Sequence, residues 1–142
     1  MKIYLASKYI KHSQVNKVIA DLLLKHGYEV FLPESIDING VTKKQMLKVG
    51  TICYQQIDSS DVILVISPYK RSVSAEIGYA IRSKLMYNKI KIVLFRIDNE
   101  ESEIEDSEAM IAPFIDYNID EYSKGEIKSA YNKLLGYLSQ LE

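Results

Sequence analysis

Residues 67–80 bring together most of the side chains that could act on a charged ligand. The stretch joins a run of consecutive apolar residues to a pattern with helical spacing, so we expect it to turn from a strand into a helix. Lys70, Arg71, Ser72 and Ser74 supply two positive charges and two hydroxyls there. With the N–H groups of the helix's first turn, they would form a small anion site whose natural ligand is a phosphate.

Glu76 falls in the expected first turn of this helix and is the candidate catalytic carboxylate. A glutamate at that place also has an ordinary structural explanation, because acidic side chains in a first turn interact favourably with the helix dipole. Lys70 and Arg71 have a similar ordinary explanation as parts of a solvated turn. The residue types alone therefore leave a structural and a functional interpretation open.

The elements that must position these residues alternate between strand and helix. Apolar runs predict strands at residues 2–6, 28–32, 61–67, 90–95 and 114–119, and helical spacing predicts helices at 13–25, 42–57, 73–86 and 124–141. The alternation predicts one α/β domain, residues 1–142, with an open parallel five-stranded sheet of the flavodoxin or Rossmann type and helices on both faces. Such sheets bind ligands beyond the carboxyl ends of their strands, where the loops should share one rim. The acidic stretch 98–108 is expected to be a mobile loop.

Length and composition narrow the function classes. The 142 residues suffice for one domain with a core, and a net charge of −1 gives no general attraction to nucleic acid polymers or anionic membranes. The single cysteine, Cys53, excludes an internal disulfide and a cysteine-based zinc site, and two histidines are too few to suggest another metal site. The sequence lacks a signal-peptide pattern and an apolar stretch of about 20 residues, so we expect a cytoplasmic protein.

Several segments, in order along the chain, resemble the nucleoside 2-deoxyribosyltransferase family, and most of all its relatives, the 2'-deoxynucleoside 5'-monophosphate N-hydrolases. The matching segments are residues 3–6, 59–63, 75–80, 94–96, 109–111 and 121–126. Residues 75–80, Ala-Glu-Ile-Gly-Tyr-Ala, resemble the family's nucleophile motif, and the last three segments resemble the carboxyl-terminal part of the hydrolase branch. The resemblance covers nearly the whole chain.

The resemblance implies that Glu76 is a nucleophile. In that family the glutamate attacks the anomeric carbon of a deoxyribosyl group and displaces the base, a step for which a carboxylate suits the oxocarbenium-like transition state. Water then completes hydrolysis, whereas a second base completes transfer. Tyr4 matches the family's first-strand tyrosine, near the base or the nucleophile, although an aromatic in an opening strand is otherwise a core residue. The resemblance implies no organic cofactor and no metal.

Three further positions bear on the substrate. Lys70 lies six residues before Glu76, at a position where the transferases carry an acid and the hydrolases carry a small hydroxyl residue. Lys70 could pair with a phosphate, so it favours a nucleotide substrate over a free nucleoside. Ser7 replaces a glycine of the family, and Cys53 replaces an aspartate, so both are expected to contact the substrate. A helical cysteine is otherwise a small buried hydrophobe. Asp58, on the same helix, is a candidate substitute for that aspartate.

Three functions remain open at this point. The first is an N-glycosidase acting on a deoxynucleoside 5'-monophosphate, with deoxyribosyl transfer as a variant of the same mechanism. The second is a TIR-like NAD glycohydrolase, because residues 66–68, Ser72 and Glu76 also resemble the strand, loop and catalytic glutamate of TIR domains. The third is a non-catalytic nucleotide-binding module, which Ser7 and Cys53 favour and Glu76 argues against.

The family resemblance also implies a homodimer or larger homo-oligomer, since a neighbouring subunit commonly completes each pocket in that family. The apolar pattern of Ile52, Tyr54 and Ile57 could supply part of the contact or could pack into the core.

Overall fold

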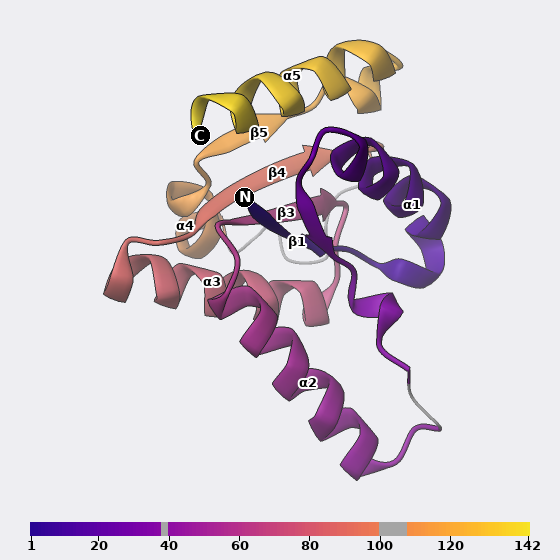
Figure 1. Ribbon diagram of the computed structural model, residues 1–142, viewed down its shortest axis with the longest axis vertical. Helices are drawn as coiled ribbons and strands as arrows, with labels where there is room; N and C mark the ends of the chain where they lie inside the picture. The colour runs from indigo at the N-terminus through magenta and orange to yellow at the C-terminus, as the bar shows by residue number, and fades with distance from the viewer. Residues whose placement is uncertain (38–39, 100–107) are drawn as a thin grey trace.

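Five parallel strands form one sheet in the order β2-β1-β3-β4-β5 (Figure 1). The structure is a computed structural model that describes residues 1–37, 40–99 and 108–142. The strands are β1 (Lys2–Ala6), β2 (Glu29–Phe31), β3 (Val62–Ser67), β4 (Lys91–Arg96) and β5 (Tyr117–Ile119). The predicted open parallel α/β sheet is therefore confirmed, with each predicted strand present.

The helices lie between the strands, as the alternation predicted. They are α1 (Tyr9–Lys25), α2 (Lys43–Asp58), α3 (Arg71–Tyr87), α4 (Glu108–Ile111) and α5 (Ile127–Gln140), with single 3-10 turns at Pro33–Ser35, Ala112–Phe114 and Tyr122–Lys124. Gly27 follows His26, the C-cap residue of α1, and has a φ of 85°, so it ends that helix as predicted. None of the described helices has the length and apolar character that a membrane span requires. The acidic loop predicted at 98–108 falls largely outside the described residues.

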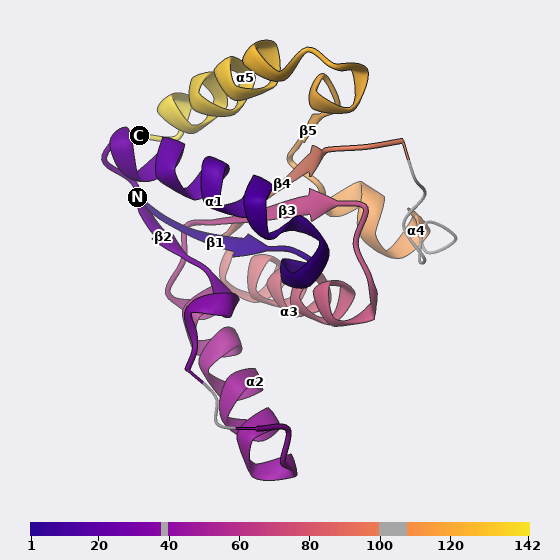
Figure 2. The same cartoon turned by 90° about the vertical axis from the view of Figure 1, so that its right-hand side faces the viewer.

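The core has two halves, one on each face of the sheet. Figure 2 shows that α1 and α5 cover one face and that α2 and α3 cover the other. Because side chains alternate along a strand, Val62, Leu64 and Ile66 of β3 pack toward α1 and α5, whereas Ile63 and Val65 pack toward α2 and α3. Every side chain of β3 is fully buried, which confirms the prediction of a central strand covered on both faces.

The first half of α2 extends away from the rest of the molecule (Figures 1 and 2). The buried residues of this 16-residue helix, Cys53 and Ile57, both lie in its second half. Ile57 is fully buried, so of the two alternatives that the sequence left open, core packing holds for this residue. Tyr54 stacks on Tyr79 of α3 at a ring-centroid distance of 4.5 Å, so part of the Tyr54 ring is covered by its own chain.

Candidate active site

The helix that carries the candidate carboxylate begins two residues earlier than its apolar spacing predicted. α3 starts at Arg71, with Lys70 at its N-cap, because the chain turns immediately after Tyr69. Glu76 therefore lies in the second turn of α3, and the expectation that it lies in the first turn is wrong. A simple favourable interaction with the helix dipole, which acts mainly within the first turn, no longer accounts for a glutamate here.

A hydrogen bond joins Glu76 to the first strand. The phenolic hydroxyl of Tyr4 donates to Oε1 of Glu76 at 2.9 Å, across 72 positions of sequence. Tyr4 is fully buried in β1, and its ring stacks on Phe31 of β2 at 5.5 Å. Tyr4 is therefore both a core residue, through its ring, and a neighbour of the candidate carboxylate, because its hydroxyl fixes one oxygen of Glu76.

Burial dominates the acidity of this cluster. It raises the pKa of Glu76 to about 7, and the hydrogen bond from Tyr4 limits that rise because it favours the charged form. Burial, together with the nearby charge of Glu76, also raises the pKa of Tyr4 far above its ordinary value, so the phenol remains a donor at neutral pH. A partly buried carboxyl group that titrates near neutrality is a common property of catalytic sites.

Cys53 completes this cluster from α2. Its buried side chain lies within hydrogen-bonding reach of Tyr4, and burial, reinforced by the charge of Glu76, raises the pKa of the thiol. The position expected to match the family aspartate thus does lie beside Tyr4 and Glu76. It carries a neutral thiol where a carboxylic acid would supply a proton more readily.

Asp58 does not take the place of that aspartate. Its carboxylate accepts hydrogen bonds from the hydroxyls of Tyr79 at 2.7 Å and Ser83 at 3.3 Å, both on α3. Cys53 and Glu76 lie at one end of the contact between α2 and α3, and Asp58 lies at the other. Asp58 therefore links α2 to α3 through these two hydrogen bonds.

The predicted anion-binding residues surround the start of α3. Lys70 and Ser72 are exposed, and Ser72 lies one helical turn before Glu76 on the same face of the helix. The first backbone hydrogen bond of α3 runs from the Ser74 N–H to the Lys70 carbonyl at 3.0 Å. The N–H groups of residues 71–73 therefore come before the first intrahelical hydrogen bond. Ser74 also donates its hydroxyl to that carbonyl at 3.2 Å, which commits this side chain to the helix itself.

Ser7 lies buried at the carboxyl end of β1, on the rim predicted for ligands. Its hydroxyl is 3.5 Å from Nδ1 of His12, which is itself buried on α1. No role was predicted for His12 from the sequence, in which two histidines are too few to suggest a metal site. The position of His12 in the first turn of the helix that follows Ser7 could have indicated this contact, because that turn comes directly after the end of β1.

The pairing of distant strands and helices therefore assembles Tyr4, Cys53 and Glu76, while Ser7 and Lys70 border the same carboxyl edge of the sheet from two different loops. Among the described residues, no group of three or more histidine, cysteine or acidic side chains could hold a metal ion. The arrangement offers a positioned, partly buried carboxylate next to a helix start that carries Lys70 and Arg71. That combination suits a substrate with an electrophilic centre and an anionic tail.

No protein-family model matches the sequence, and no curated protein matches it. Solved structures with a similar fold include the 2-deoxyribosyltransferase of the psychrotolerant bacterium Bacillus psychrosaccharolyticus, with a TM-score of 0.65 and 19% identity over 89% of this chain and 90% of that one. They also include the CMP N-glycosidase of Clostridium botulinum, with a TM-score of 0.63 and 18% identity over 96% of this chain and 99% of that one. A conserved protein from Enterococcus faecalis V583 has a TM-score of 0.57 and 18% identity over 100% of this chain and 99% of that one. The likeness shows a fold shared over nearly the whole length.

Replacement of Glu76 by glutamine should stabilise the protein at pH 8 and have little effect at pH 5. The folded pKa of about 7 exceeds the ordinary 4.5, so the wild type loses stability as the pH rises from about 4.5 through 7. Glutamine mimics the protonated group, and the difference in the free energy of unfolding should reach on the order of 1–3 kcal/mol above pH 7. Urea denaturation at both pH values measures it. Glu29→Gln, on an exposed side chain, is the control, and an equal effect in both variants would contradict the assignment.

Proposed function

We propose that this protein is an N-glycosidase that cleaves the bond between base and deoxyribose in a deoxynucleoside 5'-monophosphate. The observation that carries the proposal is the hydrogen bond from Tyr4 to Glu76, which holds a partly buried carboxylate beside β1. The fold is shared with a 2-deoxyribosyltransferase and with a CMP N-glycosidase, two enzymes that act on the bond between a sugar and a base. This likeness supports the same class of reaction here.

In the proposed reaction, Glu76 is the nucleophile. Because Tyr4 holds Oε1, the other oxygen, Oε2, attacks the anomeric carbon from the face opposite the base. A bond forms between that carbon and Oε2 while the bond to the base nitrogen breaks; the electron pair leaves with the base, which takes up a proton. Water then attacks the same carbon, regenerates the carboxylate and releases deoxyribose 5-phosphate. A second base in place of water would give transfer.

The environment of Glu76 supports this role. A carboxylate with few surrounding waters interacts more strongly with a developing positive charge than one in bulk water does. The same desolvation gives the carboxyl group its pKa of about 7, so a substantial fraction is ionised at neutral pH. The hydrogen bond from Tyr4 keeps that fraction from falling further.

The start of α3 supports a phosphate-bearing substrate. Lys70 and Arg71 add positive charge to the N-terminal end of a 17-residue helix, whose first N–H groups are themselves suited to an anion. Lys70 is six residues from Glu76, which corresponds to about 9 Å along the helix axis. A ligand that spans a sugar and a 5'-phosphate can therefore reach from one to the other.

The non-catalytic binding module is the alternative, and Cys53 is the residue that favours it. With its raised pKa the thiol stays neutral at neutral pH, so it does not supply the proton that a carboxylic acid would give to a departing base. Under the enzyme hypothesis, that proton comes from water at the open side of the site.

The decisive assay incubates the purified protein with the four deoxynucleoside monophosphates, the matching nucleosides and NAD, and follows release of free base or nicotinamide by chromatography. We expect base release from monophosphates, loss of turnover in Glu76→Gln, and a fall in kcat of about tenfold or more in Tyr4→Phe, because a hydrogen bond to a charged group contributes roughly 1.5–3 kcal/mol. Release of nicotinamide would favour the TIR-like function, and no release from any compound would favour the binding module. Unchanged turnover in Glu76→Gln would refute the nucleophile.

Lys70→Ala should raise KM for a monophosphate substrate and leave kcat nearly unchanged. The lysine contacts the phosphate away from the reacting bond, so its loss removes binding energy shared by the bound substrate and the transition state. The expected effect is about tenfold, in keeping with a charge-assisted hydrogen bond. Lys89→Ala, at an exposed position beyond the other end of α3, is the matched control. An equal change in KM for both variants would argue against a phosphate contact at Lys70.

We also propose that the projecting half of α2 pairs with a second copy of the chain. Val41, two residues before α2, and Met46 and Leu47, near the start of α2, are 84%, 54% and 71% exposed. Apolar side chains grouped on a projecting helix favour association. The family resemblance noted in the sequence supports the same expectation.

Light scattering after size-exclusion chromatography tests this association. We expect a mass of at least twice the 16.3 kDa of one chain for the wild type, and a shift to one chain for Leu47→Glu, because a charge at the contact would lose its hydration. Leu24→Glu, also exposed but on α1 at the opposite face of the sheet, should leave the mass unchanged. A monomeric wild type would contradict the proposal.

A further inference from the structure

Tyr79 lies on α3 one turn after Glu76, and α2 holds both its ring and its hydroxyl. The ring stacks on Tyr54 at a ring-centroid distance of 4.5 Å, and the hydroxyl donates a hydrogen bond to Oδ2 of Asp58 at 2.7 Å. That hydrogen bond raises the pKa of Tyr79, so the phenol stays a donor at neutral pH. Ser83, one turn further along α3, donates to Oδ1 of Asp58 at 3.3 Å. Both oxygens of the carboxylate are therefore engaged by α3.

These contacts and the candidate carboxylate share one side of α3. Glu76, Tyr79 and Ser83 are spaced by three and four positions, so they lie in one row along the helix surface. Tyr54 and Asp58 are four positions apart and form the matching row on α2. The row of α3 that begins with Glu76 is therefore the row that α2 holds.

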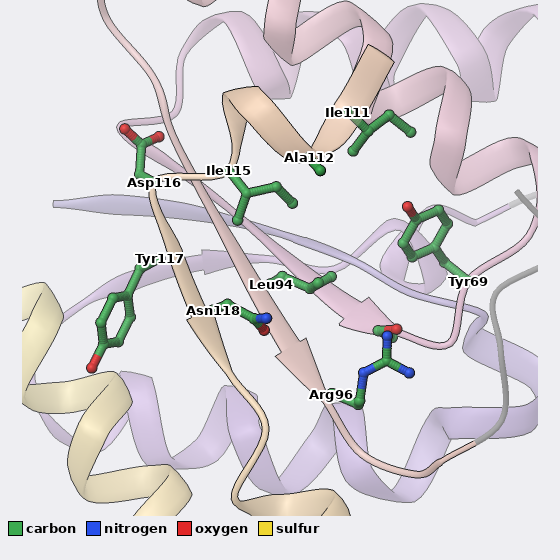
Figure 3. Close-up of a pocket in the computed structure, with 10 residues that line it drawn as sticks. Tyr69, Leu94, Arg96, Ile111, Ala112, Ile115, Asp116, Tyr117 and Asn118 are labelled. Carbon is green, nitrogen blue, oxygen red and sulfur yellow. The ribbon is translucent and has the colours of Figure 1, made fainter. Parts of the chain in front are cut away.

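The support on the other flank of α3 is less closely packed. α3 also contacts α4, and Lys84 donates hydrogen bonds to the Phe114 carbonyl at 3.0 Å and to the Asp116 carboxylate at 2.5 Å. Ile111 and Ala112, at the end of α4, line a cavity of about 440 Å³ (Figure 3). Side chains that border a cavity lack partner atoms on one side, so this segment resists movement less than a close-packed one would. The rotation of α3 about its axis is therefore fixed mainly from the side of α2.

We infer that Tyr79 is a positioning residue for Glu76. Held by Asp58, it sets the rotation of α3 that brings the carboxylate to the hydroxyl of Tyr4. Glu76 and Tyr79 are three positions apart on one helix, so a turn of α3 at Tyr79 moves the carboxylate through a similar angle. The contact that would weaken is the 2.9 Å hydrogen bond from Tyr4 to Oε1. The consequence for catalysis rests on the proposed function, whereas the consequence for this hydrogen bond does not.

Two measurable quantities depend on that hydrogen bond. It lowers the pKa of Glu76 against the larger effect of burial, so a weaker bond leaves that pKa higher. Because the nucleophile must be ionised, the pH at which kcat reaches half of its plateau should rise together with the pKa. The other described ionisable group beside the carboxyl group, Cys53, stays neutral throughout, since burial raises the pKa of its thiol.

Two variants break the contact from opposite sides. Tyr79→Phe keeps the stacked ring and removes the hydroxyl, and Asp58→Ala removes the acceptor. In each we expect kcat for a deoxynucleoside 5'-monophosphate to fall about fivefold with little change in KM, because a small misplacement of the reacting group slows the reaction rather than weakening binding. The pKa of Glu76, followed by 13C NMR of its carboxyl carbon, should rise by about 0.5 or more. The double variant should match the single ones, since both changes break one contact.

Two further variants separate positioning from a general loss of stability. Asp58→Asn retains an acceptor for the Tyr79 hydroxyl and should restore both kcat and the pKa of Glu76. Tyr137→Phe is the matched control, because Tyr137 stacks on Tyr117 at 4.4 Å on the other face of the sheet. It can lower the free energy of unfolding but should move neither quantity.

An unchanged pKa of Glu76 in Tyr79→Phe, or an equal change in Tyr137→Phe, would overturn the inference. A rise in KM with kcat and the pKa unchanged would place Tyr79 at the substrate and overturn it as well. A wild type without turnover would refute the proposed function alone, since the NMR titration needs no substrate and would still decide whether Tyr79 positions Glu76.

Discussion

The complete burial of β3 is the constraint on which the rest of the structure depends. All of its side chains, from Val62 to Ser67, are withdrawn from solvent, so helices must cover the sheet on both faces. The strand is apolar up to Ile66, and the chain becomes polar directly after it. Since the strand points its carboxyl end at the rim of the sheet, the change from apolar to polar sequence delivers Lys70, Arg71 and the start of α3 to that rim.

The candidate active site is the place where this fold accepts an unfavourable group. Glu76 lies beside Tyr4 and Cys53 of one core half, and burial raises the pKa of its carboxyl group to about 7. A protein selected for stability alone would gain by placing an apolar or neutral side chain there. The hydrogen bond from the fully buried Tyr4 offsets part of the cost and also fixes the orientation of the carboxylate. Ionisable groups in such surroundings are common in catalytic sites.

α3 separates two regions with different chemistry. On the side of β1 and α2 it presents Glu76 to Tyr4 and Cys53, where the dominant feature is a desolvated acid. On the side of β4 and β5, Arg96 and several aliphatic side chains line a cavity. Tyr69 belongs to the same core half as Val73 and also lines the cavity on the side of β4 and β5, so the loop after β3 contributes to both regions.

The sequence by itself determined the alternation of strands and helices, the fully buried β3 and the polar turn that follows it, because apolar periodicity and its interruption are local properties. It also singled out Glu76, Tyr4 and Cys53, although only through a family resemblance. Tertiary structure decided that these three residues meet, since the contact depends on β1 pairing with β3 and on α2 packing against α3. It also decided that Asp58 is engaged by Tyr79, that Ile57 is core, and that Ser67, Arg96 and Asn118 share one face. Such proximity is set by strand order and register, which no local pattern in the sequence specifies.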